Sequence, residues 1–332
     1  MSRHSRIKGF LLIGAAVVPL FVGGPRYLGA QEDPVHGEAY PLYRLMRAEL
    51  LPFEIAADAS IETIRDYYAP CSAGTDALLV SGTFRSLGMD MAAHVWSVPG
   101  RTPSGSVIVL HGYLAHPRQM APIITALILA GYDVAAPELP GHGISDGMRG
   151  YIGDFSDYGT FLDDFMSGIG ASLPGPLHII GFSTGASAVI EYLHANPDPF
   201  AAIVFASPLV RSRFFSFARV GRFVARPFTD TLRTGYDDPI GTQRMPLAWF
   251  DAQVAWNRRN TAYPVNDRPL LVVQGTRDTV VARRYNRRYL DRLFTDMEYV
   301  PIPGSRHVIY RDNSTATPSP VEETVRYIRE YQ

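Results

Sequence analysis

Lysine and cysteine are almost absent from this 332-residue sequence, and each absence excludes a class of chemistry. The one lysine, Lys8, lies near the start, so the main body has no P-loop lysine, no Schiff-base lysine and no Ser-Lys dyad. The one cysteine, Cys71, has no internal partner, which excludes a disulfide framework and a cysteine-based zinc site. A formal net charge of −1 gives no whole-chain reason to expect nucleic-acid binding.

A long apolar run is also missing, except near the start of the chain. Arg3, Arg6 and Lys8 precede an apolar stretch at 10–24, and residues 28–30 (Leu-Gly-Ala) resemble a small-residue cleavage site. The stretch is shorter than the ~20 apolar residues of a typical spanning helix. We interpret residues 1–30 as a signal peptide or signal anchor. This interpretation predicts an exported protein, periplasmic or anchored on the outer side of the inner membrane, with the segment as one route to membrane contact.

Alternating apolar segments predict an α/β fold. Residues 77–98 form two extended segments around Ser86-Leu87-Gly88, which is typical of an antiparallel hairpin. Strand-length and helix-length segments then alternate, as in a mostly parallel sheet with helices on both faces. The expected strands are 107–110, 132–139, 177–180, 203–206, 270–274 and 298–301, and the expected helices are 120–130, 156–169, 186–194 and a last one capped by Ser319.

Residues 209–264 interrupt this alternation. Five arginines between positions 211 and 226 are interleaved with five phenylalanines between positions 214 and 228. A solvated arginine face over an aromatic core would explain the pattern without a function. The functional alternative is a lid that lines an apolar pocket and touches lipid surfaces. We interpret the stretch as an inserted helical cap, so that the α/β core comprises residues 31–208 and 265–332.

The sequence Gly181-Phe182-Ser183-Thr184-Gly185 places a serine between two glycines where a strand passes into a helix. A nucleophile on so sharp a turn needs neighbours without side chains, because a Cβ at either glycine would crowd the strand and helix. Ser183 would then lie above the sheet at a helix N-terminus, where negative charge is favoured. An ordinary glycine-rich turn has the same pattern, but the strand before it and the helix after it favour a nucleophile.

A serine hydroxyl needs a base to take its proton, and the base needs a third group to orient it. His307 lies between the last predicted strand and the final helix, and Asp278 follows the strand at 270–274. Taken alone, Asp278 could be a turn residue and His307 a solvated loop residue. Both loops belong to the same edge of the predicted sheet as Ser183. We therefore predict that Ser183, Asp278 and His307 form a catalytic triad.

Catalysis by such a triad also needs two backbone N–H groups that bind the developing oxyanion. One should belong to Thr184, which follows the nucleophile, and Tyr113, in the loop after the first parallel strand, is the candidate for the other. His111 is better interpreted as shaping that loop than as a second base. His116 and His142 lack further ligands at metal-binding spacing, so we expect neither a metal nor a cofactor.

These motifs together resemble the serine α/β-hydrolase superfamily, in particular its branch of monoacylglycerol lipases, lysophospholipases and serine-aminopeptidase-like enzymes. Residues 111–116 are similar to the branch's HGxxxH loop, and residues 140–147 are similar to its GHGxSxG segment. The resemblance covers about residues 80–330 with the motifs in matching order. It implies a cap after the nucleophile's strand and triad roles for Ser183, Asp278 and His307.

Two positions depart from the pattern of that branch. Phe182 stands where histidine is frequent, and Val308 stands where an acidic residue is common. Neither change removes a member of the triad, but both weaken any transfer of substrate identity. The sequence predicts a hydrolase of monoacylglycerol-, lysophospholipid- or similar acyl esters, with a small-molecule or lipid substrate and no nucleic acid.

Two alternatives stay open. The same triad could serve an exopeptidase or amidase, for which Asp237 and Asp238 are weak candidates to bind a substrate amine, since a solvated loop explains them better. A non-catalytic lipid-binding envelope protein could also use the fold, although such a protein has no need for all three triad groups.

Overall fold

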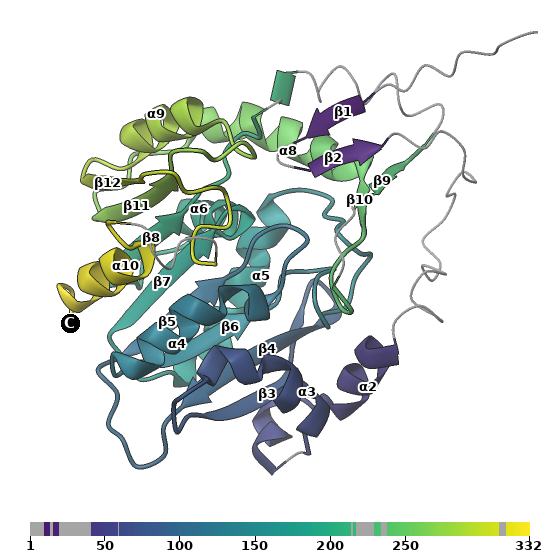
Figure 1. Ribbon diagram of the computed structural model, residues 1–332, viewed down its shortest axis with the longest axis vertical. Coiled ribbons are helices and arrows are strands. Elements are labelled where there is room, and N and C mark those ends of the chain that lie inside the picture. The colour runs from purple at the N-terminus through teal and green to yellow at the C-terminus, as the bar shows by residue number, and fades with distance from the viewer. Residues whose placement is uncertain are drawn as a thin grey trace, which may run out of the picture.

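An eight-stranded sheet forms the centre of the protein, which is described here from a computed structural model (Figure 1). The structure describes residues 10–13, 16–19, 41–58, 60–213, 215–216, 229–233, 238–311 and 317–332. The strand order is β12-β11-β8-β7-β5-β6-β4-β3. The strands are β3 (Leu78–Ser86), β4 (Met89–Ser97), β5 (Ser106–Leu110), β6 (Asp133–Pro137), β7 (Leu177–Phe182), β8 (Ala202–Ala206), β11 (Leu270–Gly275) and β12 (Met297–Ile302).

The sheet is antiparallel at one end and parallel over the rest. β3 pairs with β4, and β4 pairs with β6, in antiparallel register, whereas the pairs from β6 to β12 are parallel. The turn between β3 and β4 uses Leu87 and Gly88, which have φ angles of 53° and 75°. The predicted hairpin and the predicted mostly parallel sheet are therefore confirmed.

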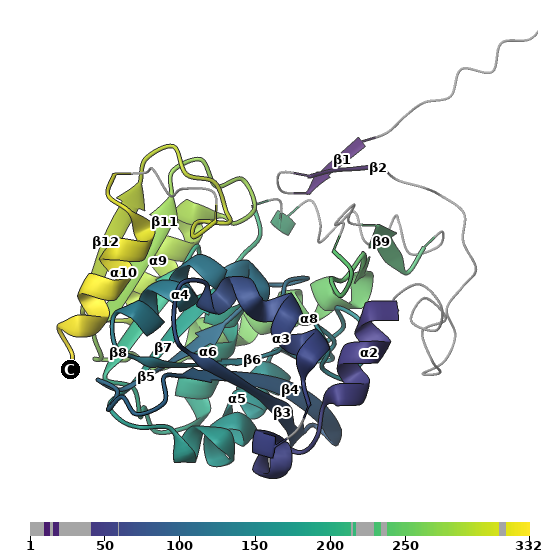
Figure 2. The same ribbon diagram turned by 60° about the horizontal axis from the view of Figure 1, so that its bottom comes forward.

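Helices cover both faces of the sheet (Figure 2). One face packs against α5 (Ser156–Ser167), α6 (Thr184–Ala195), α8 (Leu247–Arg259) and α9 (Arg283–Leu293). The other face packs against α2 (Pro41–Glu49), α3 (Glu62–Tyr68), α4 (Ala121–Leu129) and α10 (Pro320–Arg329). β5 shows how one strand supplies both layers, because Ile108 and Leu110 join the first layer while Val107 and Val109 join the second.

One core helix is absent from the expectations. Five of the eleven residues of α9 are arginines, so the segment contains few apolar residues and its composition does not indicate a core helix. The buried residues of α9 are nevertheless spaced as one helix face, at Asn286, Tyr289, Leu290 and Leu293. The three- and four-residue spacing of these buried positions predicts a helix even though arginines occupy much of the segment.

The stretch 209–264 is only partly helical in its described part. It contains α8 and the antiparallel pair β9 (Thr231–Arg233) and β10 (Arg244–Pro246). Residues 214, 217–228 and 234–237 lie outside the described residues, and with them most of the predicted arginine–phenylalanine pattern. Arg211 is half-buried, with its guanidinium 3.7 Å from the centre of the Tyr285 ring and its Nε donating to Asn257 Oδ1 at 2.6 Å.

The segment interpreted as a signal lies mostly outside the described residues. Its described backbone forms β1 (Phe10–Ile13) and β2 (Ala16–Pro19), an antiparallel pair separate from the main sheet. Among the residues that the structure describes, no helix has the length and apolar character needed to cross a membrane. The cleavage and export of residues 1–30 stay predictions.

A buried histidine in the sheet should make stability depend on pH. His178 on β7 is fully buried, and neither ring nitrogen has a partner within the described structure. Burial lowers the pKa of His178 to about 4, whereas an unfolded histidine titrates near about 6.5. Between these values the unfolded chain binds the proton more readily, so stability is lost as pH falls from about 6.5 to about 4.

We expect this histidine to contribute a loss of up to about 3 kcal/mol in the free energy of unfolding between pH 7 and pH 4. Urea unfolding at a series of pH values measures that loss. The matched variant, His178→Phe, keeps a ring beside Tyr132 but cannot be protonated, so its pH dependence should be shallower. An equally steep dependence in the variant would contradict the assignment to His178.

Candidate active site

Ser183 lies on a strained turn between β7 and α6. Its φ and ψ angles are 51° and −110°, a combination that a non-glycine residue adopts only when its surroundings impose it. Two backbone hydrogen bonds impose it here: Ser183 N–H donates to Ala206 O, and Leu209 N–H donates to Ser183 O, each at 3.0 Å. The flanking glycines leave the necessary room, since a Cβ at Gly181 would lie 2.7 Å from the Ala186 backbone.

Three side chains from three loops form one hydrogen-bonded line at the carboxyl edge of the sheet. The Ser183 Oγ atom lies 3.0 Å from His307 Nε2, and His307 Nδ1 lies 2.7 Å from Asp278 Oδ2. Asp278 follows β11, and His307 lies between β12 and α10. The structure thus brings together the three residues that the sequence singled out, at distances at which a proton can pass from serine to histidine.

Asp278 is arranged to stay ionised. Burial disfavours its charge, but hydrogen bonds from His307, from the Val280 N–H at 2.7 Å and from Gln274 Nε2 at 2.9 Å hold the pKa of Asp278 below its usual range. Gln274 is not among the residues that the sequence motifs predict for the site. It is, however, a polar residue at the end of the otherwise apolar strand 270–274, and that position would have indicated a contact with the nearby Asp278.

The two expected oxyanion donors lie in the segments next to Ser183. Thr184 is the first residue of α6, so its N–H has no acceptor within the helix. The loop that carries Tyr113 touches Ser183 through Gly112, where an added Cβ would lie 3.2 Å from Ser183 Cβ. Leu114 in the same loop has a φ of 64°.

His111 is buried inside this loop and holds its shape. Its Nε2 accepts the Leu139 N–H at 3.0 Å, and its Nδ1 lies 2.8 Å from Gly112 O, the geometry of a proton on Nδ1. Burial lowers the pKa of His111 to about 4, so the ring is neutral at physiological pH. Burial also lowers the pKa of His142, whose Nδ1 lies 2.8 Å from Pro140 O. These contacts are consistent with loop-shaping roles for both residues.

The loop at 138–150 is built around a buried carboxylate. Glu138 accepts hydrogen bonds from the Ile144 N–H and the Tyr68 hydroxyl, and its Oε1 lies 3.2 Å from His94 Nε2. Burial opposes its charge, but the hydrogen bond and charge of His94 and the hydroxyl of Tyr68 hold the pKa of Glu138 at about 2. Gly143 is required beside it, because a Cβ there would meet the carboxylate.

The cap-side helix α8 contacts both the loop that carries Tyr113 and the helix α6. Trp249 stacks on the Tyr113 ring with centroids 4.2 Å apart, and the Tyr113 hydroxyl donates to Gly150 O at 2.7 Å. Farther along α8, Trp256 and Arg259 donate to the buried carboxylate of Glu191 on α6. These contacts hold α8 against α6, the helix that follows Ser183, and against the Tyr113 ring.

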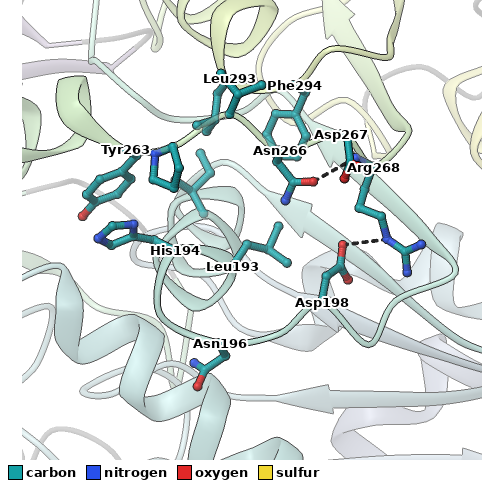
Figure 3. A pocket seen from close by; sticks show the side chains of 13 residues that line it. Leu193, His194, Asn196, Asp198, Tyr263, Asn266, Asp267, Arg268, Leu293 and Phe294 are labelled. Carbon is teal, nitrogen blue, oxygen red and sulfur yellow. Dashed lines mark hydrogen bonds and ion pairs between the residues drawn. The ribbon is translucent and has the colours of Figure 1, made fainter.

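A separate hollow of about 270 Å³ opens at the opposite, amino edge of the sheet (Figure 3). Its wall contains the stacked rings of His194 and Tyr263, 3.7 Å apart, and the ion pair of Arg268 with Asp198. None of the three triad candidates lines it. The line of Ser183, His307 and Asp278 therefore remains the candidate active site.

The strand order, the strained serine turn and the Ser–His–Asp line define a serine α/β hydrolase. Residues 101–239 match the family described as serine aminopeptidase, S33. A monoacylglycerol lipase of Mycolicibacterium smegmatis is 30% identical over 254 residues, which cover 68% of this chain and 88% of that protein. The chain belongs to the monoacylglycerol lipase-like branch of these hydrolases, a family of carboxylic-ester hydrolases.

Further proteins are similar to this chain in sequence or in fold. A monoglyceride lipase homolog of monkeypox virus is 23% identical over 248 residues, covering 68% of this chain and 90% of that protein. The monoacylglycerol lipase of Paleococcus ferrophilus has the same fold, with a TM-score of 0.58 at 22% identity over 77% of this chain and 100% of its own. A soluble variant of the yeast (Saccharomyces cerevisiae) monoglyceride lipase gives a TM-score of 0.61 at 15% identity, over 75% and 94%.

Gly185, two residues after Ser183, provides a test of the turn. In Gly185→Ala the new Cβ would lie 2.5 Å from Leu110 O, so β5 and α6 would have to separate. We expect a loss of about 1–3 kcal/mol in the free energy of unfolding and a lower kcat on a soluble ester. Gly153→Ala is the control, because its Cβ meets nothing closer than 3.5 Å. Equal stability and activity of the two variants would contradict this account.

Proposed function

We propose that the chain hydrolyses acyl esters of the monoacylglycerol or lysophospholipid type through an acyl-enzyme on Ser183. The observation that carries the proposal is the continuous line from Ser183 Oγ through His307 to the ionised Asp278. The similarity to monoacylglycerol lipases supports the choice of substrate class.

The proposed reaction has two halves. Ser183 Oγ attacks the ester carbonyl while its proton passes to His307 Nε2, and the Thr184 and Tyr113 N–H groups receive the oxyanion. His307 then gives the proton to the departing alcohol, which leaves an acyl-enzyme. In the second half, water gives a proton to His307 Nε2 while its oxygen attacks the acyl carbonyl. The bond from the carbonyl carbon to Ser183 Oγ then breaks, Oγ takes the proton back from His307, and the acid is released.

Asp278 has an orienting role in this scheme. Its carboxylate accepts the Nδ1–H of His307, which leaves Nε2 as the basic atom facing the serine. The charge of Asp278 also stabilises the imidazolium that forms in each half-reaction. The hydrogen bonds from Val280 and Gln274 keep the carboxylate fixed and ionised while it does so.

The peptidase alternative loses one of its supports. The sequence favours a solvated loop for Asp238 over a role in binding a substrate amine, and the solvated loop is wrong. Its carboxylate is largely buried and accepts from Tyr67 at 2.9 Å and from the Ile240 N–H at 3.1 Å, with His116 Nε2 3.1 Å away. Asp237 lies outside the described residues.

The first experiment compares hydrolysis of p-nitrophenyl esters from acetyl to palmitoyl, a monoacylglycerol and an aminoacyl-anilide. We expect ester turnover with a maximum at medium or long chains, and a fall in kcat on the order of 10⁴ or more in Ser183→Ala. Ser172→Ala is the matched control, because Ser172 is exposed and donates only to Ile169 O among its described contacts.

Labelling with a fluorophosphonate separates the remaining classes. Covalent capture that disappears in Ser183→Ala, but not in Ser172→Ala, is the result expected of a serine hydrolase. Cleavage of the anilide alone would reassign the chain as a peptidase. If no substrate is hydrolysed and the fluorophosphonate does not label the protein, the non-catalytic lipid-binding protein would be favoured.

We further propose that residues 1–30 direct export of the enzyme, on the basic residues and apolar stretch described above. Expressed in a Gram-negative host, the protein should reach the periplasm, and sequencing of the mature N-terminus should show cleavage near Ala30. Replacing Arg3, Arg6 and Lys8 by glutamate should block export. A full-length protein that stays in the cytoplasm would refute this proposal, whereas a full-length protein held in the membrane would indicate an anchor.

A further inference from the structure

Three segments that are far apart in the sequence meet at one buried histidine. His116 ends the loop that begins at His111, and its side chain is fully buried. Its Nε2 lies 3.1 Å from the Tyr67 hydroxyl on α3 and 3.1 Å from Asp238 Oδ2 in the cap stretch. The Tyr67 hydroxyl donates to Asp238 Oδ1 at 2.9 Å. Each of the three side chains therefore contacts the other two.

Asp238 supplies a negative charge to this junction. Burial disfavours the charge, but the hydrogen bond and charge of His116, the Ile240 N–H and the Tyr67 hydroxyl hold the pKa of Asp238 at about 2. The carboxylate is therefore ionised at neutral pH. Hydrogen bonds to an ionised acceptor are the stronger kind, so the junction joins α3, the loop and the cap stretch firmly.

The junction fixes the far end of the loop that carries a proposed oxyanion donor. The near end is fixed by His111, which accepts the Leu139 N–H. Between the two histidines, Gly112 lies against Ser183 and Phe182, and the Ala115 N–H donates to Gly112 O at 3.2 Å. Tyr113 lies inside this braced loop. An oxyanion donor works over a narrow range of distance, so a small displacement of the loop should weaken catalysis.

A second contact holds the cap stretch at the same place. The guanidinium of Arg149 donates to Ile240 O, two residues after Asp238, and to Gly143 O in the loop after β6. The position of Asp238 is thus set by the core as well as by the junction. A displacement of the cap stretch here would be passed to His116 and from there to the loop.

We propose that Tyr67 and Asp238 are positioning residues for ester hydrolysis, which act through His116 to hold the Tyr113 N–H where the oxyanion forms. This inference rests on the proposed function. Among their described contacts, neither residue touches Ser183, His307 or Asp278: Tyr67 lies on α3 and Asp238 in the cap stretch, and both contact His116. Their effect should therefore fall on the transition state rather than on substrate binding.

The test uses Tyr67→Phe and Asp238→Asn in the full chain, with p-nitrophenyl butyrate as substrate. We expect kcat to fall about tenfold in each variant while KM stays within about twofold. An alkyl boronic acid, which becomes a tetrahedral anion on the serine, should bind about tenfold more weakly in parallel. Tyr151→Phe is the control, because Tyr151 lies 37% exposed outside this junction and should keep wild-type kinetics.

Titration of active sites by fluorophosphonate, taken to completion, gives kcat per competent molecule. A merely structural role would lower the free energy of unfolding but leave that kcat and the boronate affinity unchanged, and this result would overturn the inference. If Asp238→Asn fails to fold, Tyr67→Phe decides, since it deletes one hydroxyl. Ester activity that survives in Ser183→Ala would instead overturn the proposed function itself.

Discussion

The strained backbone of Ser183 is the constraint on which the rest of the site depends. A φ of 51° and a ψ of −110° persist only because β7, β8 and α6 hold the turn from both sides. The same packing forbids a side chain at Gly181 and Gly185. The sheet and its helices thus do more than support Ser183, because they direct its side chain toward the loops that carry His307 and Asp278.

Buried polar groups, rather than apolar contacts alone, shape the loops around that turn. Glu138 organises the loop after β6, and Glu191 joins α6 to α8. Asp278 is enclosed by donors in the same way. Each carboxylate lies where an unpaired charge would be strongly destabilising, so its donors must keep their places. A loop built on such a group has one well-defined conformation, which is what preorganised catalysis requires.

Much of the fold could be predicted from local pattern. The β3–β4 hairpin, the parallel strands and the capped last helix follow from alternation, turn residues and the Ser319 N-cap, whose Oγ accepts the Glu322 N–H. The helix α9 escaped because its arginines mask a clear helical face. The strands β9 and β10 are each three residues long, which is too short to show the alternation of apolar and polar residues that predicts a strand.

The sequence by itself determined the residue types and their order: a serine between glycines, an aspartate after one strand and a histidine after another. These are local properties, and the proposed roles of nucleophile, base and orienting acid follow from them. Only the tertiary structure decided which distant groups would meet. Gln274 at Asp278, and Tyr67 with Asp238 at His116, are brought together by the packing of separate elements. The spacing of residues in the sequence does not predict these side-chain contacts, because they depend on how whole helices and strands pack against one another.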